Sequence, residues 1–394
     1  MALVSRWKRL AAAAVLCAWV SAAAADAAWA QAGGAGSRTA GAAQQALALE
    51  QQGQWKDAEA AWRQVLAAHP RDAAACGHLG IVLAREGDYR GAEEAYRRAL
   101  RLDPRMTGLQ LDLGLALFKQ GKLKEAIAPL KAAVAAAPGD MQPRVLLGMS
   151  YYGVGEFAEA VPELRFAVEK SPAAGPGTQE LRGVLAQACL YARQFDCTLA
   201  QFKKIVAANP NSAQADMLAG EALDGMNRTA EAIAQFEAAE KVAPQEPNVH
   251  FGLGYLLWKQ HQYAQAAKEF ELETENVPNH AQALAYLGDT EMKLEQTAEA
   301  QTTLERAVQV PGAQRMAWVD LGIVLAGEGK NDAAESDFER AIAMDPNQVD
   351  AHWRLARLYQ AEGKTEQARA EFAKASALHA KQDQSLVQQM TPGK

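Results

Sequence analysis

Histidine and cysteine are the side chains in this sequence to consider first for catalysis or metal binding. The seven histidines are scattered, and neither the His-Glu-x-x-His pattern of a metal-binding helix nor the Gly-x-x-x-x-Gly-Lys and Gly-x-Ser-x-Gly motifs occur. His250 and His352 occupy the same position of an internal repeat, a position that normally packs, so we interpret them as packing residues rather than metal ligands. We therefore expect no enzyme activity, no cofactor and no metal site.

Disulfide chemistry is the second candidate. Without Cys17, which lies in an N-terminal segment that we expect to be removed, the cysteines are odd in number and include no Cys-x-x-Cys pair. Cys189 and Cys197 lie on either side of a predicted helix turn, where a disulfide is possible if their Cβ atoms come close. The alternative is two helix residues that never meet, and the sequence leaves both open.

The elements that position all these side chains follow from a repeat of 34 residues, with a single interval of 38. Each repeat is counted from a first small residue. A second small residue, usually Ala, lies 12 positions after it, and a large apolar residue lies 16 positions after it. In nine repeats a Pro lies 23 or 24 positions after the first small residue and closes the unit. Regular spacing of this kind predicts pairs of packed helices, with Pro ending the second helix of each pair. The first small residues are Ala46, Gly80, Gly114, Gly148, Ala186, Gly220, Gly254, Gly288, Gly322 and Ala356.

These columns resemble the tetratricopeptide repeat family over residues 39–380. Repeat nine matches the family pattern most fully, through Trp318, Leu321, Gly322, Leu325, Ala334, Phe338 and Pro346. The resemblance implies an all-α, right-handed superhelical solenoid of about ten helix-turn-helix repeats. It also implies that peptides or partner helices bind along the inner concave surface.

The N-terminal residues differ from the repeats. A basic start is followed by an apolar run over 10–20, too short to be a stop-transfer helix, and then by Ala-Trp-Ala at 28–30. This pattern is typical of a secretory signal peptide cleaved before Gln31, with an uncleaved anchor as the alternative. We therefore expect an exported, bacterial-type protein that is periplasmic or secreted, with no membrane insertion after cleavage.

The domain organisation that we expect follows from the repeat and the N-terminal pattern. The 38-residue interval is interpreted as a longer loop, although a joint between two blocks of repeats is also possible. The expected parts are a signal peptide at 1–30, a flexible lead at 31–41, repeats one to four at 42–172, an inserted loop at 173–179, repeats five to ten at 180–380, and a C-terminal cap and tail at 381–394.

One stripe of each first helix lies opposite its packing stripe and carries large apolar residues where polar ones would suffice. We predict that this stripe lines a peptide-binding groove, with aromatic platforms and cationic edges. Packing between successive first helices is the alternative explanation. The predicted groove residues are Leu111, Leu115, Phe118, Lys119, Val145, Met149, Tyr152, Phe251, Tyr255, Trp258 and Lys259.

The formal net charge of -7 and the pI of about 5.6 argue against nucleic acid as a partner. We therefore expect a protein–protein interaction scaffold of the cell envelope that binds an extended segment or helix of another protein. A self-assembling structural protein is the alternative, and a carbohydrate-binding protein is less well supported.

Overall fold

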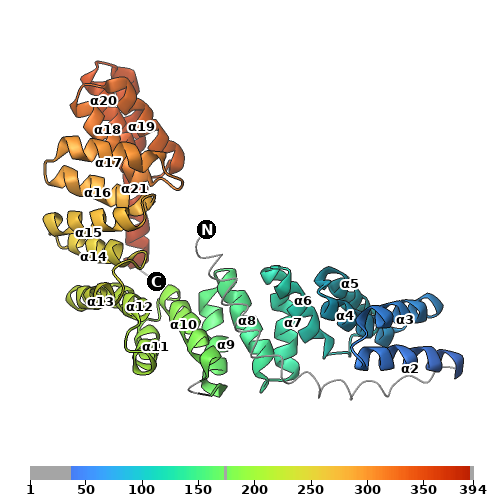
Figure 1. Ribbon diagram of the computed structural model, residues 1–394. Helices are drawn as coiled ribbons and strands as arrows, with labels where there is room; N and C mark the ends of the chain where they lie inside the picture. The colour runs from blue at the N-terminus through green and yellow to red at the C-terminus, as the bar shows by residue number, and fades with distance from the viewer. Residues whose placement is uncertain (1–36, 173–174, 391–394) are drawn as a thin grey trace. The chain divides into compact units, whose positions relative to one another are not determined.

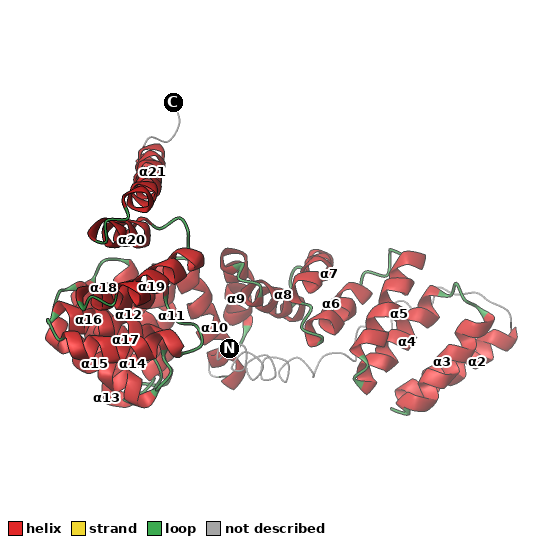
Figure 2. Cartoon of the chain, turned by 90° about the horizontal axis from the view of Figure 1, so that it is seen from above, coloured by secondary structure: helices red, strands yellow, loops and turns green. Residues whose placement is uncertain are grey.

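The computed structural model describes residues 37–172 and 175–390. Within these ranges the chain forms 20 helices and no strands (Figure 2), which confirms the expected all-α class. The predicted signal peptide, residues 31–36 of the predicted lead, and residues 173–174 and 391–394 lie outside the described residues. None of the described helices is both long enough and apolar enough to cross a membrane.

The first compact unit ends at Pro210 and contains five helical hairpins (Figure 1). Each hairpin packs on the next, so the hairpins stack in chain order. The helices are α2 (Ser37–Gln51), α3 (Trp55–Ala68), α4 (Ala73–Glu86), α5 (Tyr89–Leu102), α6 (Leu109–Lys119), α7 (Leu123–Ala136), α8 (Met141–Gly153), α9 (Phe157–Lys170), α10 (Pro176–Tyr191) and α11 (Phe195–Ala208).

The second compact unit begins at Asn211 and repeats the same arrangement with five more hairpins. Ten hairpins in the described residues match the number that the sequence predicts. The helices are α12 (Ala213–Gly225), α13 (Thr229–Val242), α14 (Val249–Lys259), α15 (Tyr263–Asn276), α16 (Ala281–Lys293), α17 (Thr297–Gln309), α18 (Arg315–Gly327), α19 (Asn331–Met344), α20 (Val349–Ala361) and α21 (Thr365–Met390).

In the seven repeats whose first small residue is Gly, this residue lies against the large apolar residue of its own second helix. A Cβ atom on Gly80 would lie 2.5 Å from Cε1 of Tyr96, so the two helix backbones approach closely only because the side chain is absent. Phe236 extends this contact to the next hairpin, because its ring lies against both Gly220 and Gly252. The large residue therefore fills the space within its hairpin and, at Phe236, the space between hairpins.

The turn inside each hairpin contains one residue with positive φ. In six hairpins this residue is Gly, as at Gly87 with φ of 86° and Gly329 with φ of 76°. In the other four the same position is occupied by Arg193, Asn227, His261 and Glu295, with φ between 57° and 62°. The repeat therefore imposes a left-handed turn even where the sequence lacks the residue that adopts it at no cost.

Successive first helices also contact each other, for example α6 with α8 and α14 with α16, whereas the second helices make no comparable contacts in the described residues. Within each unit the first helices therefore lie closer together than the second helices. This places the first helices on the inner side of each stack, as the resemblance implies.

Two predicted boundaries are wrong. The lead predicted at 31–41 is shorter, because α2 already begins at Ser37. The loop predicted at 173–179 is also shorter, because α10 begins at Pro176, and Pro is well suited to the first position of a helix. The extra residues thus lengthen α10, which still packs on α9.

Candidate functional site

The predicted groove residues of the first unit lie mostly within the packing between neighbouring hairpins. Phe118 and Met149 are 5% and 2% exposed, so they belong to the hydrophobic core and their assignment to an open groove is wrong. Leu111, Leu115 and Val145 are half-buried and pack against the same core. For these five residues, close contact between successive first helices explains why the stripe is apolar.

Tyr152 and Lys119 are the polar members of the predicted groove in the first unit. The hydroxyl of Tyr152 donates a 2.8 Å hydrogen bond to Oε1 of Gln187 on the next first helix, and burial raises the pKa of Tyr152 strongly. Lys119 is half-buried, and burial lowers its pKa. Tyr152 thus joins two hairpins, and only part of this stripe is open to a partner.

The second unit brings four aromatic side chains together on its first helices. We call Phe251, Tyr255 and Trp258 of α14, together with Tyr286 of α16, the aromatic patch. The ring centroid of Tyr286 lies 5.9 Å from that of Phe251, 5.5 Å from that of Tyr255 and 5.2 Å from that of Trp258, and all three pairs have edge-to-face geometry. All four residues are half-buried, so each packs through part of its surface and leaves part exposed.

Charged side chains border the aromatic patch and tie its helix to both neighbours. Nε1 of Trp258 donates a 2.7 Å hydrogen bond to Oδ2 of Asp289 on α16, and Nζ of Lys259 lies 2.6 Å from Oδ1 of Asp224 on α12. Lys259 also lies over the ring of Tyr255, 5.6 Å from its centroid. Aromatic rings, an ammonium group and carboxylates therefore lie together at this place.

Glu273 of α15 positions the start of the helix that carries the patch. Its side chain is fully buried and accepts hydrogen bonds from the backbone N–H groups of Asn248 at 2.9 Å and Phe251 at 3.1 Å. Asn248, the N-cap residue of α14, makes no capping hydrogen bond with its own side chain. Glu273 thus replaces the usual N-cap, and its negative charge suits the positive end of the helix dipole.

A buried carboxylate lies further along the same series of first helices. Asp320 of α18 is 7% exposed, and its Oδ2 has no hydrogen-bond partner among the described residues. Burial and, secondarily, the charge of Asp289 raise the pKa of Asp320 to about 7, although Lys293 and Arg354 oppose the shift.

Sequence reasoning missed two aromatic residues of the first helices. Tyr286 lies one position away from the predicted stripe, and only the packing of α16 on α14 brings it to the patch. Trp353 of α20 falls on the stripe itself and is 40% exposed, with Arg354 and Arg357 over its ring at 5.2 Å and 5.3 Å. Applying the stripe to repeat ten would have found Trp353.

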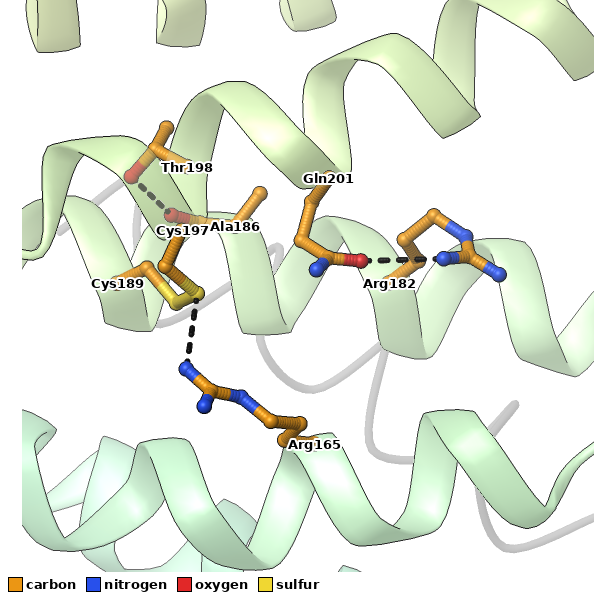
Figure 3. The surroundings of a disulfide bond; sticks show 7 residues. All are labelled: Arg165, Arg182, Ala186, Cys189, Cys197, Thr198 and Gln201. Atoms are coloured by element: carbon orange, nitrogen blue, oxygen red, sulfur yellow. Dashed lines mark hydrogen bonds between the residues drawn. A yellow bond between two sulfur atoms is a disulfide. The ribbon is translucent and has the colours of Figure 1, made fainter.

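Cys189 and Cys197 form a disulfide in repeat five, with their Cα atoms 5.8 Å apart (Figure 3). The bridge joins α10 to α11 beside a second contact between these helices, in which Oγ1 of Thr198 donates to the carbonyl of Ala186. Arg165 of α9 approaches Sγ of Cys197 at 3.5 Å. Cys76 is a buried free thiol, whose pKa is raised by burial.

Comparisons with known families match this architecture. Two family models, both described as tetratricopeptide repeat, match residues 43–106, 79–140, 184–247, 217–281 and 251–318, and residues 325–390. The chain belongs to the tetratricopeptide repeat family. A comparison with curated proteins finds no match.

Several solved structures are similar to parts of the chain. YrrB, described as a TPR protein with an unusual peptide-binding site, is 24% identical with a TM-score of 0.40, covering 48% of this chain and 98% of YrrB. PilF of Pseudomonas aeruginosa is 19% identical with a TM-score of 0.47, covering 56% of this chain and 97% of PilF. Naa15/Naa10 bound to HypK-THB is 16% identical with a TM-score of 0.46, covering 87% of this chain and 64% of the other.

Proposed function

We propose that the chain is an interaction scaffold of the cell envelope, which binds an extended segment or a helix of a partner protein at the aromatic patch of the second unit. The observation that carries the proposal is the group of Phe251, Tyr255, Trp258 and Tyr286, four half-exposed rings on two neighbouring first helices. Aromatic side chains in such a group supply much of the contact energy in protein interfaces.

The charges around the patch favour a polypeptide as the ligand. Lys259 and Asp224 form an ion pair on one side of the patch, and Asp289 with Lys293, 3.3 Å apart, forms another on the other side. Apolar rings flanked by charges of both signs suit a segment that alternates apolar and charged residues. The envelope location rests on the signal-like pattern of residues 1–30, and cleavage is tested by the N-terminal sequence of the purified protein.

The test is a capture experiment with the chain from Gln31 onward and envelope extract of the source organism. Tyr255→Ala and Trp258→Ala are combined in one variant, which removes two rings of the patch. Phe251 is left unchanged, because its ring also packs on Phe270, with the two ring centroids 6.0 Å apart. Tyr191→Ala is the matched control, since Tyr191 is 44% exposed in the first unit and outside the predicted stripe. Circular dichroism checks that each variant is folded.

A partner that is retained by the native chain and the Tyr191 variant, and lost by the double variant, supports the proposal. A photo-crosslinking residue at position 255 should also form a crosslink to that partner, and the same residue at position 191 should not. Capture that survives the double variant contradicts the patch assignment. Recovery of the chain alone in every capture favours the self-assembling alternative.

A further inference from the structure

A cluster of three potential metal ligands lies on the second helix of repeat six and both helices of repeat seven. Nδ1 of His250 on α14 lies 2.7 Å from Oε2 of Glu269 on α15, and Glu240 of α13 completes the group. One ligand atom from each residue lies within 4.8 Å of the other two. His250 is 3% exposed and the two carboxylates are half-buried, so the cluster is partly shielded from water.

Repeat ten contains the same histidine–glutamate pair and provides an internal comparison. His352 and Glu371 lie three repeats after His250 and Glu269, and Nδ1 of His352 is 2.6 Å from Oε2 of Glu371. There Nζ of Lys374 lies 2.6 Å from the same carboxylate. Repeat ten therefore balances its half-buried carboxylate with a protein cation.

Repeat seven lacks this cation and has an extra carboxylate instead. The residue that corresponds to Lys374 is Leu272, and the residue that corresponds to Glu240 is Ile342. Two carboxylates therefore face one imidazole in repeat seven, and no protein cation is paired with Glu269 in the described residues. Such an arrangement leaves negative charge in a partly dehydrated place, which is costly unless a cation binds there.

The surroundings of the second histidine ring nitrogen, Nε2, also differ between repeats seven and ten. Nε2 of His352 lies 3.2 Å from the carbonyl oxygen of Pro346. In repeat seven the corresponding carbonyl, that of Pro244, accepts a 2.9 Å hydrogen bond from Nδ2 of Asn276.

The pKa values of the two glutamates differ in the same way. Burial and the charges of Glu240 and Glu237 raise the pKa of Glu269, against the hydrogen bond from His250. In repeat ten the opposing hydrogen bonds from Lys374 and His352 outweigh burial, and the pKa of Glu371 is lowered.

In place of the packing role that the sequence suggests for His250, we propose that Glu240, His250 and Glu269 bind a divalent metal ion of the zinc class. One imidazole and two carboxylates are a ligand set that zinc accepts, with water in the remaining position, whereas calcium and magnesium prefer oxygen ligands alone. Ligand atoms around tetrahedral zinc lie about 3.3 Å apart, a spacing that falls between the 2.7 Å from His250 to Glu269 and the 4.8 Å within which all three ligand atoms lie. The ion would join α13 to α14 and α15, and thus hold two successive hairpins together through the residue that precedes Phe251 of the aromatic patch.

The first test is calorimetric titration of the chelator-treated full chain with zinc chloride. We expect one saturable site, a rise in Tm with zinc, and a loss of affinity of about tenfold or more in Glu240→Gln. Glu240 is half-buried and has no role in the core, so this variant should fold. Glu231→Gln is the matched control, because Glu231 is an exposed carboxylate of the same helix outside the cluster, and it should leave the affinity unchanged.

A second variant tests the comparison with repeat ten. Leu272 is 39% exposed, so Leu272→Lys should be tolerated and should place an ammonium group beside Glu269, as Lys374 lies beside Glu371. We expect this variant to weaken zinc binding by about tenfold or more, and Leu272→Ala to leave it unchanged. The proposal is overturned if the native chain shows no saturable zinc binding tighter than about 100 µM. It is equally overturned if Glu240→Gln and Leu272→Lys both bind zinc as the native chain does.

Discussion

Gly322 of α18 lies directly against the ring of Phe338 of α19, sixteen residues later in the same hairpin. A Cβ atom on Gly322 would lie 2.6 Å from Cε1 of the ring, and Phe338 is 2% exposed. Because the ring is buried in a close-packed core, the missing side chain sets the distance between the two helices.

We expect Gly322→Ala to lower the free energy of unfolding by about 1–3 kcal/mol, because overpacking outweighs the better helix propensity of Ala. Gly327→Ala is the matched control, since Gly327 ends the same helix and its added Cβ would meet nothing within 4 Å. Urea unfolding followed by circular dichroism measures both variants. Equal stability of the two variants would contradict the close contact.

Glu295 occupies the left-handed turn position that Gly fills in most hairpins, with φ of 62°. We expect Glu295→Gly to raise the free energy of unfolding by about 0.5–1 kcal/mol, because the relief of backbone strain exceeds the entropy cost of Gly. Asn227→Gly should have a smaller effect, because Asn adopts this conformation more easily. The same urea titrations test the order, and a loss of stability in Glu295→Gly would rule out strain at this turn.

Glu273 supports the first turn of α14, and its removal leaves the backbone N–H groups of Asn248 and Phe251 without their acceptor. We expect Glu273→Ala to lower the free energy of unfolding by about 2–3 kcal/mol, as for a lost hydrogen-bonded charge. Glu271→Ala on the exposed face of α15 serves as the control and should change little. Hydrogen exchange should show the difference locally, as faster exchange at the start of α14.

Asp320 should make stability fall as the pH rises. Its pKa is about 7 in the folded chain and 3.8 is its ordinary value, so between these values the folded state holds the proton more tightly than the unfolded state. The contribution of Asp320 is therefore fully present below about pH 4 and is lost as the pH rises through about 7.

Asp320→Asn removes this titration and keeps a similar shape. We expect the variant to be more stable than the native chain by about 1–3 kcal/mol at pH 8.5, with a much smaller difference at pH 5. Comparing the two proteins at each pH separates Asp320 from Glu291, whose pKa is also raised to about 7, chiefly by burial. An equal difference at both pH values would show that Asp320 does not titrate in this range.

The sequence alone determined the number of hairpins, their helices and the contact partners inside each hairpin. The interval between Gly80 and Tyr96, repeated along the chain, already predicts which residues meet, because helix geometry converts a fixed spacing into a fixed contact. The turn positions obey the same repeat spacing. The alignment of Glu295 and Arg193 with Gly329 could therefore have predicted their left-handed backbone conformation.

Only the tertiary structure decided which stripe residues are exposed and which distant side chains meet. Phe118 is buried and Trp258 half-exposed at the same position of their repeats, because exposure depends on the side chains of the neighbouring hairpin. The patch includes Tyr286, and the cluster joins Glu240 to His250 and Glu269, through contacts between helices that no single-helix periodicity encodes. A repeat specifies packing within its own period, whereas a surface is shared by several repeats and depends on the residues in which those repeats differ.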